Sequence, residues 1–249
     1  HIHLFTGSIG ARRTAVALAP AGALFHFAAI GVWCTRHTGI FSDPGMPYSL
    51  VAFFLALGQV MANFVPRWSA VGSLSLPLAF VALSYAGVQQ GPGGLESAGG
   101  TALLRPHVLV LLLGFCALAL AFCLAVIYQL QSRLLKAKDV SGMFSRLPPL
   151  DSVANWAHWL AIIGFSMLTL GVITGTMAAP HALGAQWYSS PRLLPGLITS
   201  LVAWVIYAAY LGVSLGLGWR GRRTTYFLIA GFAVVLLAFF VSVGRHKGG

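Results

Sequence analysis

One histidine of this sequence lies where an ionisable side chain is costly. His26 stands in Ala23-Leu24-Phe25-His26-Phe27-Ala28, inside a long apolar stretch. It is about eight residues from the outer end of its expected helix, which is about 12 Å at 1.5 Å per residue. An imidazole at that depth needs a partner or a metal, because hydrocarbon satisfies no polar group.

A second histidine is expected in the same leaflet on another helix. His107 follows Arg105-Pro106, and proline favours the first position of a helix. His107 should therefore lie in the opening turn of its span, on the outer side. Two neutral imidazoles in one leaflet are what a six-coordinate haem b requires. The alternative is that each histidine forms a hydrogen bond with a carbonyl of a neighbouring helix.

The other histidines are weaker candidates for a metal site. His246 closes the last apolar stretch on the same side as His107, so it is the reserve ligand. His37 and His181 fall in outer loops or at a helix end, where a solvated surface residue is expected. His158 is placed near the inner surface, too far from His26 to share a metal.

The composition indicates that lipid is the solvent for most of the chain. Of 249 residues, 58% are hydrophobic and 8% are charged, whereas soluble domains carry about 25% charged residues. The formal net charge of +11 does not indicate nucleic acid, because the basic residues occupy short gaps between apolar stretches. The carboxylates fall in predicted loops, and no hydrolase or phosphate-binding motif is present, so an enzyme of those classes is not indicated.

The sequence predicts an all-α fold, a polytopic transmembrane helical bundle that forms a single integral membrane domain over 1–249. Each expected span has about 20 apolar residues. The residues before the first span resemble the tail of an earlier segment, so a missing upstream helix would make eight spans. The seven spans in this chain are placed at 14–34, 48–65, 71–88, 106–130, 155–178, 194–216 and 226–243.

Basic residues set the expected orientation. The side that holds residue 1 collects ten of them: Arg12, Arg13, Arg67, Arg133, Lys136, Lys138, Arg146, Arg220, Arg222 and Arg223. The other side collects five: Arg36, Arg105, Arg192, Arg245 and Lys247. The positive-inside rule makes the first side cytoplasmic. The C-terminus and the loop 180–192 should then face outward from a bacterial-type inner membrane.

Several motifs of the second half resemble the cytochrome c assembly family of membrane haem-handling proteins. The likeness is strongest over 105–243 and closest to the small HemX-like (YpjD-like) branch, rather than to the full CcsA synthetase subunit. The first half matches more loosely, through Phe25-His26 and the helix lengths. Four stretches carry the resemblance: 106–108 with 129–135, 147–151 with 163–175, 200–207, and 218–232.

The chain departs from the synthetase pattern at its external signature. Synthetase-type members carry a segment similar to W-x-W-D-P-K, which is thought to hold haem flat for ligation to apocytochrome. Residues 187–192 read Trp-Tyr-Ser-Ser-Pro-Arg, so Trp187 and the basic Arg192 remain, but the second Trp and the Asp do not. A family histidine after the following span is replaced by Tyr210.

The resemblance implies a haem-handling subunit and not a working synthetase. Its external histidines correspond to His107 and His246 in this chain. We expect a non-enzymatic subunit that binds haem b near the outer leaflet, with His26 and His107 as axial ligands and with Trp187 and Arg192 beside the cofactor. It would act with other membrane or outer-face cytochrome or assembly subunits, in haem delivery or electron transfer. A structural membrane anchor that has lost haem is the alternative, and a haem lyase component is a third reading.

Overall fold

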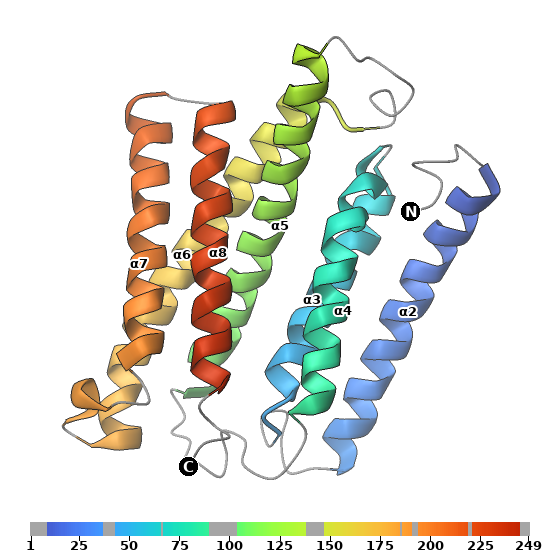
Figure 1. Ribbon diagram of the computed structural model, residues 1–249. Helices are drawn as coiled ribbons and strands as arrows, with labels where there is room; N and C mark the ends of the chain where they lie inside the picture. Colours follow the sequence, from blue (N-terminus) through green and yellow to red (C-terminus); the bar gives the residue numbers. More distant parts are fainter. Residues whose placement is uncertain are drawn as a thin grey trace. The chain divides into compact units, whose positions relative to one another are not determined.

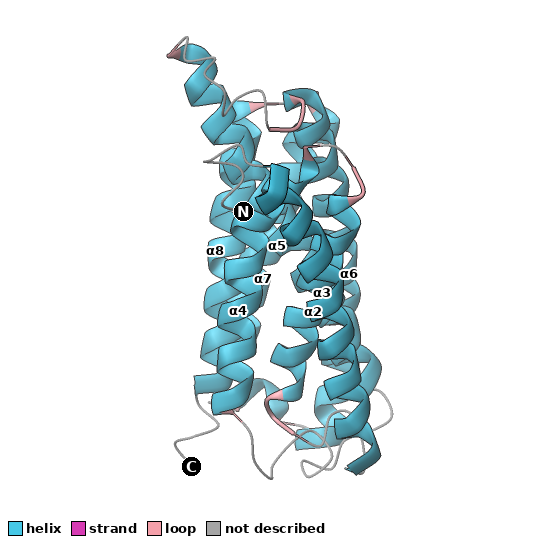
Figure 2. Cartoon of the chain, turned by 90° about the vertical axis from the view of Figure 1, so that its right-hand side faces the viewer, coloured by secondary structure: helices cyan, strands magenta, loops and turns pink. Residues whose placement is uncertain are grey.

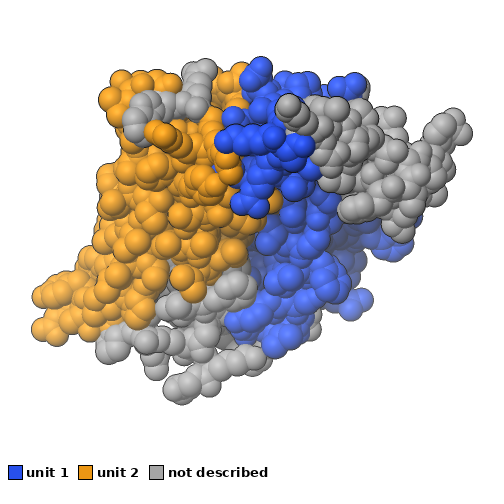
Figure 3. Space-filling model, turned by 45° about the horizontal axis from the view of Figure 1, so that its top comes forward, with its two compact units in different colours: residues 1–98, 127–153 blue, residues 99–126, 154–249 orange. Residues whose placement is uncertain are grey.

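Every regular element in the described part of the chain is helical (Figure 2), as a bilayer demands, because only helices or closed barrels satisfy every backbone group in hydrocarbon. The computed structural model describes residues 9–36, 43–65, 67–89, 104–137, 147–184, 186–190, 194–218 and 221–244. These residues fall into two compact units (Figure 3). Unit 1 comprises His1–Ala98 with Ile127–Val153, and unit 2 comprises Gly99–Val126 with Ala154–Gly249.

Unit 1 contains three helices that follow one another in the chain, with α2 against α3 and α3 against α4 (Figure 1). Arg67 has a φ of 71°, a left-handed conformation that lets the chain reverse between α3 and α4. At the same end, the buried Gln59 amide donates to Asn63 Oδ1 at 2.8 Å and accepts from Ser75 at 3.4 Å. The elements are α2 (Ile9–Arg36), α3 (Met46–Asn63), the 3₁₀ turn η1 (Trp68–Val71) and α4 (Gly72–Val88).

Unit 2 is built around close contacts between its last two helices, α7 and α8 (Figure 1). Tyr207 of α7 and Phe232 of α8 are both fully buried, and Phe232 stacks on Phe122 with ring centroids 4.9 Å apart. Gly231 admits the Tyr207 ring, because a Cβ there would come within 2.9 Å of its Cε2 atom. The elements are α5 (Leu104–Lys136, shared with unit 1), α6 (Leu150–Leu183), the 3₁₀ turn η3 (Trp187–Ser189), α7 (Leu194–Leu211), the π-helical turn η4 (Gly212–Gly216) and α8 (Arg222–Gly244).

The predicted helical membrane bundle is confirmed. Within the described residues, six helices are long and apolar enough to cross a membrane. They are Ala17–Arg36, Met46–Asn63, Trp68–Val88, Leu104–Lys136, Leu150–His181 and Leu194–Gly216. The seventh expected span, 226–243, coincides with α8, whose described side chains end at Leu237. The single-domain organisation stays a prediction.

Two helices run well beyond the spans expected for them. α5 has 33 residues and α6 has 34, whereas about 20 cross the hydrocarbon core. The buried Gln131 amide helps to hold the extension of α5, because it donates to Pro148 O at 2.8 Å. Asp151 lies in the first turn of α6, where the positive end of the helix dipole stabilises a carboxylate.

The orientation remains a prediction, and cysteine labelling tests it. In a Cys34→Ser background, Ser190→Cys should label from outside intact cells and Ser141→Cys only after permeabilisation. Cys34 must be removed because it is exposed, whereas the buried Cys116 and Cys123 should stay inert. Labelling of Ser141→Cys in intact cells would reverse the topology.

Candidate functional site

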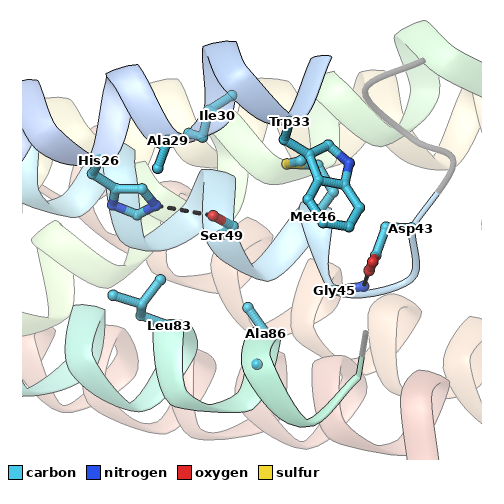
Figure 4. Close-up of a pocket in the computed structure, with 11 residues that line it drawn as sticks. His26, Ala29, Ile30, Trp33, Asp43, Gly45, Met46, Ser49, Leu83 and Ala86 are labelled. Atoms are coloured by element: carbon cyan, nitrogen blue, oxygen red, sulfur yellow. Dashed lines mark hydrogen bonds between the residues drawn. The ribbon is translucent and has the colours of Figure 1, made fainter. Parts of the chain in front are cut away.

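His26 is held within unit 1 by a contact between helices. Its Nε2 atom lies 2.9 Å from the Ser49 hydroxyl of α3 (Figure 4). Its ring meets Phe53 edge-on, with centroids 5.8 Å apart and planes at 83°. The serine hydroxyl can donate or accept, so this contact leaves the tautomer of His26 open. The imidazole is therefore partnered at one nitrogen by a hydroxyl of the neighbouring helix, whereas the alternative sequence interpretation expected a carbonyl.

A cavity of about 260 Å³ opens beside His26 and Ser49 in unit 1. The two polar groups lie at one end, and Asp43 and Gly45 lie at the other (Figure 4). Asp43 is only 5% exposed, and its carboxylate accepts a hydrogen bond from the Gly45 amide. The sequence placed Asp43 in a loop and gave no sign of its burial. Between the ends, the walls are mostly apolar: Ala29, Ile30, Trp33, Met46, Leu83, Ala86 and Gly87.

His107 is held within unit 2 by groups of α6. Its Nδ1 atom lies 2.9 Å from the Gly171 carbonyl oxygen and 3.2 Å from Thr174 Oγ1. A carbonyl can only accept, so Nδ1 carries the proton at that contact. The threonine hydroxyl donates back to its own helix, at 2.8 Å from Leu170 O. It can therefore also accept from Nδ1. Neutral His107 is thus the Nδ1–H tautomer, with a lone pair on Nε2.

His107 and His26 are suited to binding a haem iron to different degrees. Metal-binding histidines commonly donate their second ring nitrogen to a carbonyl, which is the arrangement at His107. At His26, the Ser49 hydroxyl occupies the vicinity of Nε2, so an iron bound there would have to displace it. The cavity beside His26 is slightly below the range of about 300–1,000 Å³ for small-molecule sites. Its walls would enclose part of a haem and not the whole.

The remaining candidates have separate surroundings. Trp187 lies in η3, partly exposed, with its ring 6.2 Å from that of Tyr188. Arg192 and His246 lie outside the described residues. His26 belongs to unit 1 and His107 to unit 2, so their pairing stays a prediction. Among the described residues, no three His, Cys, Asp or Glu side chains gather as a metal site.

His158 has partners that the sequence did not indicate. Its Nδ1 atom lies 3.0 Å from the Tyr210 hydroxyl of α7 and 3.3 Å from Ser214 Oγ. Ser214 stands in the π-helical turn η4, which departs from the regular α-helix expected for 194–216. No motif in the sequence signals a π turn, although a glycine stands at each end of it. His158 therefore joins α6 to the end of α7 within unit 2.

His181 behaves as the surface residue expected from the sequence. It is exposed near the end of α6, and its Nδ1 atom donates to Met177 O at 3.0 Å, one turn earlier. Its hydrogen bond stays within its own helix, so replacing it should leave the contacts of the other histidines unchanged. His181 is therefore a suitable control position.

Known proteins resemble the chain, two of those named here over about three quarters of its length. "Cytochrome c biogenesis protein CcsA" of Heterosigma akashiwo is 27% identical over 227 residues, covering 75% of this chain and 69% of that protein. The protein of the same name in Microcystis aeruginosa is 26% identical over 254 residues, covering 79% and 76%. That of Prochlorococcus marinus is 38% identical over 110 residues, covering 43% and 33%. No solved structure matches the chain.

The sequence match to the protein family extends across both units. The family described as "Cytochrome C assembly protein" matches residues 21–246, a range that includes His26, His107 and the Trp187 turn. The assignment to the HemX-like branch stays a prediction, since the relatives named above all carry the name CcsA. The sequence, its helical membrane fold and this match together establish that the chain belongs to the cytochrome c assembly protein family.

Proposed function

We propose that this protein binds haem b near the outer leaflet of a bacterial-type inner membrane and passes haem or electrons to an outer-face partner. It would do so as a non-enzymatic subunit of a larger membrane complex. The observation that carries the proposal is the hydrogen bond from His107 Nδ1 to Gly171 O, at 2.9 Å. That bond leaves Nε2 as a Lewis base, which is the form of histidine that binds iron.

In this proposal, His107 and His26 would hold the haem iron, and His246 is the reserve ligand. Bound haem would supply a one-electron iron centre. Gly171 and Thr174 keep the His107 proton on Nδ1, and the apolar walls beside His26 exclude water from that imidazole. Trp187 and Arg192 would contact the outer edge of the cofactor. Membrane and outer-face cytochrome or assembly subunits are the partners, and nucleic acid is not.

Replacement of Ser49 tests the role of His26. If iron competes with the Ser49 hydroxyl for Nε2, Ser49→Ala should retain haem at least as well as the wild type through purification. The matched control is Ser73→Ala, because the Ser73 hydroxyl bonds only a local carbonyl, Ala70 O at 2.7 Å. Haem retention is measured as the ratio of haem absorbance to protein. Loss of haem in Ser49→Ala alone would show that Ser49 supports the ligand instead of competing with it.

The second candidate function is a structural membrane anchor without haem. It is favoured by one observation, that both imidazoles already have partners across helices, at 2.9 Å in each case. Iron analysis of protein purified from haem-replete cells separates the two functions. The haem function predicts iron bound in a fixed ratio to protein, and colourless protein without iron would leave only the anchor.

A further inference from the structure

Three glycines of α6 face α5 at spacings of seven and four residues, but they meet different kinds of neighbour. A Cβ at Gly164 would overlap the side chain of Leu118 and lie 3.2 Å from its backbone nitrogen, and a Cβ at Gly171 would overlap the side chain of Leu111. A Cβ at Gly175 would instead lie 2.7 Å from His107 Cε1, 3.2 Å from Nδ1 and 3.4 Å from Nε2. The sequence suggests close helix packing for all three. The structure separates Gly175 from the others.

We propose that Gly175 and Thr174 are positioning residues for His107, which together fix the direction of its Nε2 lone pair. The role as a ligand rests on the function proposed above. The positioning of the imidazole does not rest on that function, because it is a property of the haem-free protein. Gly175 leaves the space that the imidazole occupies, and Thr174 reinforces the Gly171 carbonyl as acceptor of the Nδ1 proton.

The rigidity of the imidazole makes the space at Gly175 matter. A leucine tip can move away from a new methyl group by changing rotamer, whereas a histidine ring can only swing as a whole. The Cε1 atom that would meet the methyl group lies between the two ring nitrogens. An alanine at 175 must therefore rotate the ring or push α5 away from α6. Either movement lengthens the Nδ1 contact to Gly171 O and redirects Nε2.

Thr174 and Gly175 constrain the ring in complementary ways. The Thr174 hydroxyl donates to Leu170 O and lies 3.2 Å from Nδ1, so it offers Nδ1 a second acceptor. Gly175 leaves the room that the ring needs on the side of Cε1. Loss of the hydroxyl should weaken the preference for the Nδ1–H tautomer without moving the ring. A methyl group at residue 175 would fill the space beside Cε1, and it should move the ring even though the Gly171 and Thr174 acceptors are both present.

The test compares Gly175→Ala with Gly164→Ala, which also crowds α5 against α6, through the side chain and backbone nitrogen of Leu118, but does not touch His107. In haem-free protein, ¹⁵N NMR of labelled histidine should show the Nδ1–H tautomer at His107 in the wild type and in Gly164→Ala. Gly175→Ala should give a mixture of tautomers. Thr174→Val should also give a mixture, and Thr174→Ser should restore the wild-type spectrum.

The haem-loaded protein gives the second measurement. Gly175→Ala should bind haem about 10–100-fold more weakly, the usual effect of removing a group that orients a metal ligand, while Gly164→Ala stays close to the wild type. A Gly175→Ala protein with unchanged tautomer at His107 would overturn the inference. So would an equal change in Gly164→Ala. If the wild type binds no haem but Gly175→Ala still shifts the tautomer, the positioning holds and the proposed function fails.

Discussion

Replacement of His107 by alanine should abolish or convert the low-spin haem spectrum of the purified protein. The Gly171 carbonyl and the Thr174 hydroxyl of α6 orient the His107 imidazole, and no other imidazole among the described residues contacts these two groups. His26→Ala should have the same effect if His26 is the second ligand. Haem retention in either variant should fall by at least the roughly 10–100-fold expected for losing a group that merely orients a ligand.

The controls for this experiment come from histidines that are not expected to bind haem. His181→Ala should leave the spectrum unchanged, because His181 is exposed and bonds only Met177 O of its own helix. His37→Ala should behave in the same way. If His26→Ala leaves the spectrum intact and His246→Ala removes it, His246 is the second ligand. Unchanged spectra in His107→Ala, His26→Ala and His246→Ala would exclude these three histidines as haem ligands.

Gly45→Ala should give the second large effect, a loss of stability in unit 1. A Cβ at Gly45 would overlap the carbonyl oxygen of Ala86 and lie 2.9 Å from Asp43 Oδ1. The first of these neighbours is backbone in α4, so it cannot move aside as a side chain could. Overpacking of this kind typically costs about 1–3 kcal/mol. The free energy of unfolding, measured by denaturant titration in detergent, should fall by that amount.

Gly87→Ala is the matched control, because Gly87 lines the same cavity and a Cβ there meets nothing within 4 Å. It lies in α4, where alanine is favoured over glycine by up to about 1 kcal/mol. Gly87→Ala should therefore be neutral or stabilising. Equal stability of the two variants would show that Gly45 is not in close contact with α4.

The sequence predicted the helical fold well because lipid leaves few alternatives for an apolar stretch of about 20 residues. It underestimated α5 and the start of α6 because residues 131–136 and 150–154 include polar groups that weaken the hydropathy signal. The expected loop 180–192 also begins too early, because α6 continues through Pro180 to Leu183. Gln131 stabilises one such end through Pro148 O, a contact that only the fold reveals. The π-helical turn at Gly212–Gly216 was missed because no sequence pattern distinguishes it from an α-helix.

The candidate site was predicted in part. His26 and His107 stand out because an imidazole within an apolar stretch requires a partner, and each has one in the structure. The partners themselves, Ser49 and Gly171, could not be predicted. A serine and a glycine backbone are common in membrane helices, and their approach depends on how the helices are rotated. The neighbour of Gly175 could not be predicted either, since spacing alone does not distinguish a glycine beside leucine from one beside histidine.

The reduced-minus-oxidised optical difference spectrum of the purified wild-type protein tests the central claim most directly. The protein should be isolated from haem-replete cells, with its total iron determined on the same sample. We predict a sharp band of low-spin haem b, in proportion to protein, because His107 presents a bare Nε2 and His26 can supply a second imidazole. A flat difference spectrum in protein without iron would contradict haem binding.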